Sequence, residues 1–313
     1  MTKEAELKPV TILGVPLALG CGISGVELGP AAMRAAKVGQ RLRQLGLIVN
    51  DLGDCKIPVG GPSSAREATS QTTKPRYLSE ISEVCFSLAE QVTGILEVGA
   101  LPLILGGDHA IAAGSVSGVS NFFRKAEKPF GLLWFDAHAD MNTPESSPSG
   151  NLHGMPLAVL LGFGAKELTH IFGFAPKVNP QCCVHIGARD VDLGERELIK
   201  NLGLHFFTMR DIDEQGMSAC IDQALKIIKS QADDFAVTFD IDALDPGDAP
   251  GSGTLVRGGL TYREAHLAME KVAEAGGLCS FEMVEINTVL DYNNRTAELG
   301  VELILSALGK SIL

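Results

Sequence analysis

Short apolar runs alternate with longer segments of helical spacing along the whole chain, and this alternation limits the fold more than any other feature. Six runs of three to five residues have the length and apolar character of buried strands. Alternating strands and helices predict a mostly parallel sheet with helices on both faces. The expected strands are 10–13, 101–105, 131–135, 184–186, 235–239 and 282–286, and the expected helices are 30–45, 77–98, 196–202, 217–232, 262–275 and 296–308.

The size and composition of the chain favour one globular α/β domain over residues 1–313. Hydrophobic residues make up 45% of the 313 positions, which is enough for a large buried core. The segment 60–75 is polar and is expected to be a long loop, but no change in composition marks a second core.

Charge and hydropathy exclude two classes of partner. The net charge of −12 opposes nucleic acid, and no cluster of lysines and arginines offsets it. The longest apolar stretches, such as 101–105 and 301–308, are far shorter than the roughly 20 residues that span a bilayer. We therefore expect neither a nucleic-acid partner nor a membrane span.

The chain ends and the cysteines bear on the cellular location. The acidic start lacks the pattern of a secretory signal, so a cytoplasmic location is expected. The C-terminal Ser-Ile-Leu resembles a peroxisomal address without its basic residue, which leaves a peroxisome-like organelle as the alternative. Seven cysteines without a Cys-x-x-Cys pair predict reduced, mostly buried thiols.

Three possible metal ligands follow the apolar run 131–135 at alternating positions: Asp136, His138 and Asp140. In a parallel sheet, ligands bind at the carboxyl ends of the strands, where such groups can converge on one cation. A surface strand with a polar outer face would give the same alternation. The apolar run before these residues favours the buried strand and hence the metal site.

Two further expected strands end in groups of the same kind. Asp240 and Asp242 follow the run 235–239, and His109 follows 101–105 after a pair of glycines that allow a sharp turn. With the first three residues they give four carboxylates and two imidazoles, more than one ion can use. This set, without thiolate, favours manganese, with cobalt, nickel or iron as alternatives. Two ions that share carboxylates can activate a water molecule, so we expect a hydrolase.

These strand ends resemble a known family. Residues 106–109, 136–140 and 240–246 match the three metal-binding signatures of the ureohydrolases, the arginase and agmatinase group, and segments 12–46 and 284–297 are similar to bacterial-type arginases. The resemblance implies two Mn²⁺ ions per subunit. It assigns His109, Asp136, Asp140 and Asp240 to the first ion, and Asp136, His138, Asp240 and Asp242 to the second.

The same resemblance implies that the substrate is L-arginine. The loop 142–154 is similar to the loop that grips the amino-acid end of the substrate in arginases. Asn142, Ser149 and Asn151 would bind the α-carboxylate, and Asp192 and Glu195 would bind the α-ammonium. Composition alone would make the loop an ordinary surface turn, and the two acids would suit a helix N-terminus.

The resemblance also assigns catalytic roles. Asp140 would orient the attacking hydroxide and pass a proton to the leaving amine, and His153 would shuttle protons to bulk water. Glu285 would pair with the substrate guanidinium. A second glutamate in the same stretch, Glu282, does not match the family position.

One loop departs from the usual arginase pattern. Thr254, a candidate substrate-binding residue, keeps the family form, but Ser252 and Leu255 stand where threonine and proline are common. These departures leave the fine substrate preference open. The alternatives are therefore an agmatinase, another guanidino-compound ureohydrolase, or a metal-binding relative without activity. Arginases are commonly trimers or hexamers, which implies a homo-oligomer, with a trimer favoured.

Overall fold

Eight strands within the part of the chain that the structure describes form one parallel sheet. The computed structural model describes residues 8–58 and 75–312. The strand order is β2-β1-β3-β8-β7-β4-β5-β6, and every neighbouring pair is parallel. The strands are β1 (Val10–Val15), β2 (Val49–Asp54), β3 (Leu101–Gly106), β4 (Gly131–Phe135), β5 (Cys183–Ile186), β6 (His205–Phe207), β7 (Phe235–Asp240) and β8 (Leu278–Val284).

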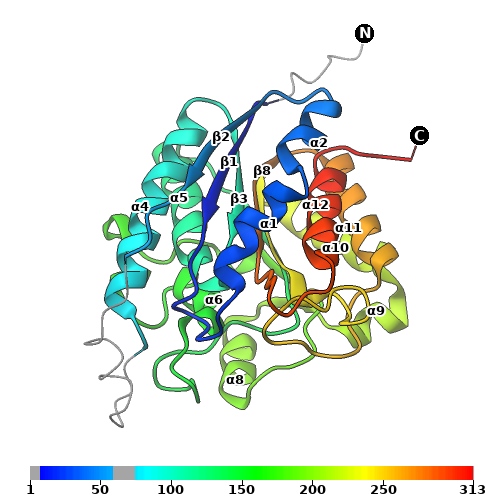
Figure 1. Cartoon of the computed structure of the whole chain (residues 1–313). Helices are drawn as coiled ribbons and strands as arrows, with labels where there is room; N and C mark the ends of the chain where they lie inside the picture. Colours follow the sequence, from blue (N-terminus) through cyan, green and yellow to red (C-terminus); the bar gives the residue numbers. More distant parts are fainter. Residues whose placement is uncertain (1–7, 59–74, 313) are drawn as a thin grey trace.

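Helices cover both faces of this sheet, and each face has its own apolar core. Figure 1 shows α4 and α5 on one side of the strands and α10, α11 and α12 on the other. The first core lies under α4 (Leu78–Glu97), α5 (Ala112–Lys125), α6 (Pro156–Leu160), α7 (Lys166–Thr169) and α8 (Leu193–Leu202). The second lies under α1 (Gly29–Ala35), α2 (Val38–Gln44), α9 (Met209–Gln215), α10 (Met217–Lys229), α11 (Tyr262–Ala275) and α12 (Arg295–Ala307). The predicted α/β class is confirmed.

The strands that carry apolar runs are those buried on both faces. Every residue of β1, β3, β4, β5 and β7 is buried, as expected for the interior of a parallel sheet. Two strands were not predicted, β2 and β6, which form the two edges of the sheet. Most of β2 is solvent-exposed and β6 has only three residues, so neither has the apolar run that marks a buried strand.

Helix α5 was also missed, because its sequence is rich in glycine and serine. It packs closely against α4, and its glycines permit that approach. A Cβ atom on Gly114 would lie 2.6 Å from the carbonyl oxygen of Cys85, and one on Gly118 would lie 2.6 Å from that of Ala89. The small residues that weaken the helical pattern are therefore what the packing requires.

Two predicted elements have different bounds in the structure. The expected helix 30–45 is divided into α1 and α2 at Lys37, which adopts a left-handed conformation with φ of 64°. The last strand spans 278–284 in place of 282–286, so the residues after Val284 belong to the loop beyond the strand. This shift moves Glu285 from the sheet to its carboxyl edge, where the other candidate residues lie.

Two further sequence predictions concern the surface of the molecule. The polar segment expected to be a loop lies outside the described residues, apart from Pro75. Across 8–58 and 75–312, no helix is both long and apolar enough to cross a membrane. The seven cysteines are free and buried, and burial raises the pKa of each thiol, which agrees with the expected reduced state.

Candidate metal centre

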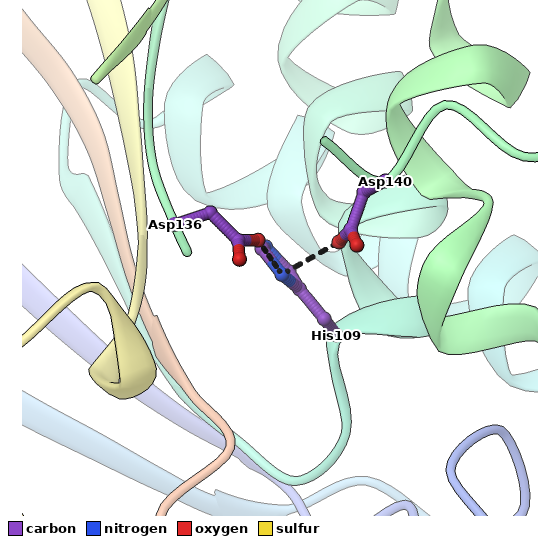
Figure 2. Close-up of side chains that lie close together, drawn as sticks. All are labelled: His109, Asp136 and Asp140. Carbon is purple, nitrogen blue, oxygen red and sulfur yellow. Dashed lines mark ion pairs between the residues drawn. The ribbon is translucent and has the colours of Figure 1, made fainter. Parts of the chain in front are cut away.

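Three carboxylates surround one nitrogen of His109 at the carboxyl edge of the sheet. The Nδ1 atom of His109 lies 3.1 Å from Asp136 Oδ2, 3.0 Å from Asp140 Oδ2 and 3.3 Å from Asp240 Oδ2. Figure 2 shows the carboxylates of Asp136 and Asp140 on either side of the imidazole. The histidine follows β3, Asp136 and Asp140 follow β4, and Asp240 ends β7, so three strands converge here.

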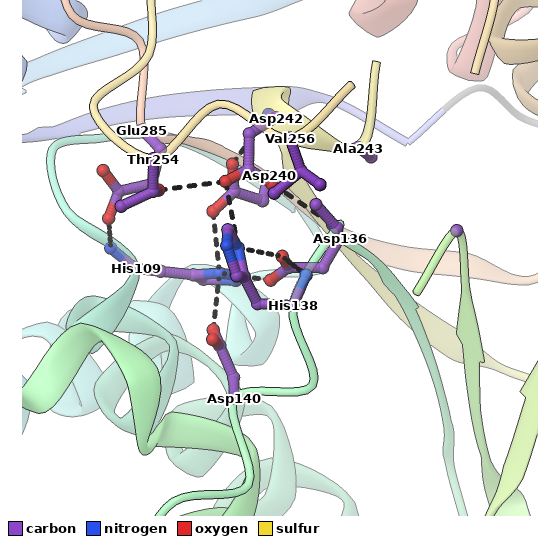
Figure 3. A network of polar contacts seen from close by, with 12 residues as sticks. His109, Asp136, His138, Asp140, Asp240, Asp242, Ala243, Thr254, Val256 and Glu285 are labelled. Atoms are coloured by element: carbon purple, nitrogen blue, oxygen red, sulfur yellow. Dashed lines mark hydrogen bonds and ion pairs between the residues drawn. The ribbon is translucent and has the colours of Figure 1, made fainter. Parts of the chain in front are cut away.

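A second cluster adjoins the first and shares Asp136 with it. His138 Nδ1 lies 3.2 Å from Asp242 Oδ2 and 3.5 Å from Asp136 Oδ1. Asp136 therefore presents one oxygen to each cluster, as a carboxylate that bridges two ions would. All six residues predicted from the sequence as metal ligands lie together in Figure 3.

The polar atoms crowded in the first cluster fit a bound cation. His109 Nδ1 and Asp140 Oδ2 are buried and lie 3.0 Å apart, yet neither makes a well-aligned hydrogen bond to any of the described residues. Burial and the charge of Asp136 raise the pKa of Asp140 to about 7. Burial and the charges of Asp242 and Asp136 also hold the pKa of Asp240 well above its usual range. Buried charges of one sign require a partner of the other, and divalent ions at the two clusters would provide it.

Two residues of the site have a strained backbone. Asp140 and Glu285 adopt φ of 52° and 62°, a left-handed conformation that costs free energy in residues other than glycine. Each side chain is buried and points into the site. The strain persists because the surrounding contacts fix both turns, including the bond from the Glu285 N–H to the Gly107 carbonyl at 2.9 Å.

Glu285 links a predicted metal ligand to the predicted proton shuttle. Its Oε1 atom accepts a hydrogen bond from the backbone N–H of His109 at 2.9 Å and lies 3.1 Å from His153 Nδ1. Burial lowers the pKa of His153, but the hydrogen bond and charge of Glu285 outweigh that effect and raise it to about 9. Contact with Glu285 thus favours the charged form of the His153 imidazole.

A pocket opens above the two clusters, and the predicted amino-acid recognition residues line it. Ser149 and Asn151 come from the loop after β4, and Asp192 comes from the loop after β5. The complete lining is His138, Asp140, Asn142, Ser147, Pro148, Ser149, Asn151, His153, Gly154, Asp190, Asp192, Glu195, Asp240 and Thr254. The structure therefore places the neutral donors and the acids around one opening, with the clusters at its base.

The loops that form the pocket are joined by hydrogen bonds. Asn142 Nδ2 donates to Asp192 Oδ2 at 2.9 Å, which ties the loop after β4 to the loop after β5. Glu195 accepts from the backbone N–H groups of Met141 and Asp192 with its two oxygens, at 2.9 and 2.7 Å. Asp192 and Glu195 thus form a capping box at the start of α8 and also line the pocket, so the capping contacts are present and substrate binding by these two acids stays a prediction.

Three residues that the sequence did not single out contribute to this region. Asp190 lines the pocket, and Arg76 Nη1 donates to Asn151 Oδ1 at 3.4 Å. The guanidinium of Arg189 donates to five backbone carbonyls, including Asp242 at 2.7 Å, and so holds the strand-end loops together. An arginine beside the acidic segment 190–195 was a usable signal, whereas nothing in the sequence pointed to Arg76.

The loop that departs from the family pattern also reaches the site. Thr254 Oγ1 donates to Asp242 Oδ2 at 3.0 Å. Ser252 is buried and its hydroxyl has no hydrogen-bond partner among residues 8–58 and 75–312, and the side chain of Leu255 is exposed. Of these three residues, Thr254 alone lines the pocket. Ser252 and Leu255, the two positions that depart from the family pattern, are not part of its lining.

Comparisons with known proteins agree with this geometry. The Arginase family model matches residues 8–309. The arginase of Bacillus caldovelox is 44% identical over 98% of this chain and 100% of its own length. Its solved structure has a TM-score of 0.91 with this one, with the same coverage. An arginase of Staphylococcus aureus is 42% identical over the full length of both chains.

A more distant solved structure shares the same architecture. Entamoeba histolytica arginase in complex with L-ornithine is 31% identical, covers 97% of this chain and 99% of its own, and has a TM-score of 0.87. Sequence, fold and the arrangement of histidines and aspartates thus lead to one assignment, which confirms the resemblance found in the motifs. The chain belongs to the arginase family.

Proposed function

We propose that this protein hydrolyses L-arginine to L-ornithine and urea with two Mn²⁺ ions. The observation that carries the proposal is the pair of carboxylate–imidazole clusters that share Asp136, together with a pocket beside them that is lined by the residues predicted to bind the amino-acid end of the substrate. A metal pair provides the hydrolytic chemistry, and the pocket provides the selectivity. The match to the arginase family supports both parts.

The proposed metal ligands divide between the two clusters. His109, Asp136, Asp140 and Asp240 would hold the first ion, and Asp136, His138, Asp240 and Asp242 the second. Mixed oxygen and imidazole ligands suit Mn²⁺, with Co²⁺, Ni²⁺ or Fe²⁺ as substitutes. When bound, the two ions supply Lewis acidity and lower the pKa of a water molecule, which becomes the nucleophile.

The chain's own residues would bind and orient the substrate and move its protons. The carboxylate of Glu285 lies beside the clusters and would pair with the guanidinium, which places the guanidinium carbon over the metal centre. Asp140 would hold the proton that the leaving amine requires. His153 would exchange that proton with solvent, since its side chain is partly exposed and lines the pocket.

Replacing His153 by asparagine is expected to lower turnover about a hundredfold, the lower end of the usual contribution of a general acid or base, while the bound metal remains. The side chain contacts Glu285 and none of the proposed ligands, so its loss removes proton exchange but not a ligand. Steady-state urea release and metal analysis of the same preparation test this. Loss of either ion from the variant would contradict a proton-shuttle role.

The charges in the pocket favour arginine over smaller guanidino compounds. Asp190, Asp192 and Glu195 concentrate negative charge where an α-ammonium would lie, and Ser149 and Asn151 offer neutral donors for an α-carboxylate. Agmatine lacks the carboxylate and would leave those donors unpaired, which costs affinity. The Entamoeba histolytica relative in complex with L-ornithine supports an amino acid as the bound group.

A substrate panel tests the proposed function. Urea release is measured with Mn²⁺-loaded protein and L-arginine, agmatine or guanidinobutyrate at equal concentrations. We expect kcat/KM for arginine to exceed the other two values by at least about tenfold, the effect of roughly 1.4 kcal/mol of lost pairing. Higher activity on agmatine or guanidinobutyrate would assign the chain to those alternatives. Absence of urea from all three would support a metal-binding relative without activity.

The assembly and the location of the protein are part of the same proposal. We propose a homo-oligomer, with a trimer favoured and a hexamer as the alternative, because arginases commonly assemble in this way. We place the protein in the cytoplasm, and a peroxisome-like organelle is the alternative that its C-terminal residues leave open.

A further inference from the structure

The second ring nitrogen of His109 belongs to a buried chain of hydrogen bonds that the proposed mechanism does not use. His109 Nε2 lies 3.0 Å from Thr238 Oγ1, and Thr238 Oγ1 donates to Glu282 Oε1 at 2.8 Å. The three residues are 1%, 0% and 2% exposed. This series of hydrogen bonds runs from the metal centre into the sheet, away from the pocket.

The direction of these bonds fixes the position of the proton on the imidazole. The hydroxyl of Thr238 has one hydrogen, which it donates to Glu282, so towards His109 it acts as an acceptor. The imidazole must then carry its proton on Nε2. A neutral imidazole with that proton has its lone pair on Nδ1, the atom that faces Asp136, Asp140 and Asp240.

The pairing of β7 with β8 fixes the positions of Thr238 and Glu282 relative to each other. Thr238 on β7 and Glu282 on β8 are direct partners in the register of these parallel strands. Both strands lie in the centre of the sheet, with β8 between β3 and β7. The threonine and the glutamate therefore cannot separate without breaking the central pairing of the fold.

Trp134 holds the other side of the same imidazole. Its ring stacks on that of His109 with centroids 4.4 Å apart, and its indole N–H donates to Asp136 Oδ2 at 3.0 Å. The ring plane of the histidine is thus set by stacking, and its rotation in that plane is set by Thr238. The other ring nitrogen, Nδ1, therefore faces the carboxylates of the first cluster.

We propose that Thr238 and Glu282 are positioning residues that hold His109 in the tautomer and orientation needed to bind the first metal ion. The inference rests on the proposed two-ion centre and assigns a role to the glutamate that matches no family position in the motif. Hydrogen-bond partners of this kind commonly change metal affinity by 10–100-fold when they are removed.

Binding of Mn²⁺ to the purified full-length protein tests the proposal. Free Mn²⁺ is followed by electron paramagnetic resonance during titration of the wild type and of Thr238→Val, which keeps the shape and removes the hydroxyl. The wild type is expected to bind two ions. The variant is expected to bind one ion 10–100-fold more weakly and the other with unchanged affinity.

A matched control separates this selective loss from a general loss of stability. Thr93 on α4 is also buried, and its hydroxyl is also hydrogen-bonded: it contacts the carbonyls of Ala89 and Gly118 and accepts from Asn121 Nδ2. Thr93→Val is expected to lower the melting temperature and to keep both ions. Thr238→Ser, which retains the hydroxyl, should restore the affinity of the weakened ion.

Two variants of the glutamate keep the proposal testable if Thr238→Val does not fold. In Glu282→Met the threonine hydroxyl is free to donate to His109, which would place the imidazole proton on Nδ1 and weaken the same ion. Glu282→Gln keeps an acceptor and should bind both ions within a few-fold of the wild type.

The outcomes distinguish this inference from the proposed function. Wild-type affinity for both ions in Thr238→Val or in Glu282→Met would overturn the positioning role and leave the two-ion centre in place. Equal weakening of both ions in Thr238→Val would also overturn it, because His109 is the one proposed metal ligand that the Thr238 hydroxyl contacts. A wild type that binds fewer than two ions would overturn the two-ion centre itself and the inference with it.

Discussion

Replacing Asp136 by alanine is expected to remove both metal ions and to lower urea release by more than about three orders of magnitude. This carboxylate presents one oxygen to each cluster, so its loss affects both at once. A metal-activated water contributes several kcal/mol to lowering the barrier, and each 1.36 kcal/mol is a factor of ten in rate. Metal analysis and urea release, measured on one preparation, provide the check.

A control variant shows whether the effect belongs to the site. Asp211→Ala removes an aspartate that caps α9 through Thr208 and lies outside both clusters. It should cost some stability and leave the metal content and turnover near the wild-type values. If Asp136→Ala retained two tightly bound ions and full turnover, the assignment of the bridging ligand would be wrong.

The second large effect is expected for Glu285→Gln. Glutamine keeps the size of the side chain and an oxygen that can accept from the His109 N–H, but it removes the charge that would pair with the guanidinium. Removing one member of a buried charge pair costs about 2–5 kcal/mol, so kcat/KM for arginine should fall by roughly 30- to 5,000-fold. The bound metal should be unchanged.

The comparison with another glutamate isolates the contribution of the charge at this position. Glu298→Gln makes the same change at an exposed position in the first turn of α12 and should leave kcat/KM near its wild-type value. Unchanged activity in Glu285→Gln would refute guanidinium pairing. Loss of metal from that variant would instead place Glu285 among the residues that support the ligands.

The centre of the fold could be predicted from the sequence because burial on both faces of a parallel sheet produces continuous apolar runs. The two edge strands of the sheet could not be predicted from the sequence. Solvent contact removes that pattern from β2, and β6 has three residues. Helix α5 escaped prediction for a different reason, since Gly114 and Gly118 serve close packing with α4 at the expense of helix propensity.

The candidate metal ligands could be found because they follow recognisable strands at short spacings. The contacts that support these ligands and the pocket could not be found from the sequence. Thr238 reads as an ordinary strand residue until the sheet pairs it with Glu282, 44 positions later. Arg76 donates a hydrogen bond to Asn151, which lies 75 positions later, and no local sequence pattern predicts such a contact. Long-range pairing of this kind depends on strand order, which the sequence motifs do not state.

The candidate metal ligands and the candidate substrate-binding residues lie in different parts of the fold, so evolution can change the substrate without changing the metal centre. The candidate metal ligands stand at the ends of central strands, where a substitution disturbs the interior of the sheet. The candidate residues for the amino-acid end of the substrate stand on the loop after β4, on the loop after β5 and, for Glu195, in the first turn of α8; Ser149 and Asp192 are exposed there. New substrates could thus be acquired by altering two surface loops, while the hydrolytic chemistry beneath them is inherited unchanged.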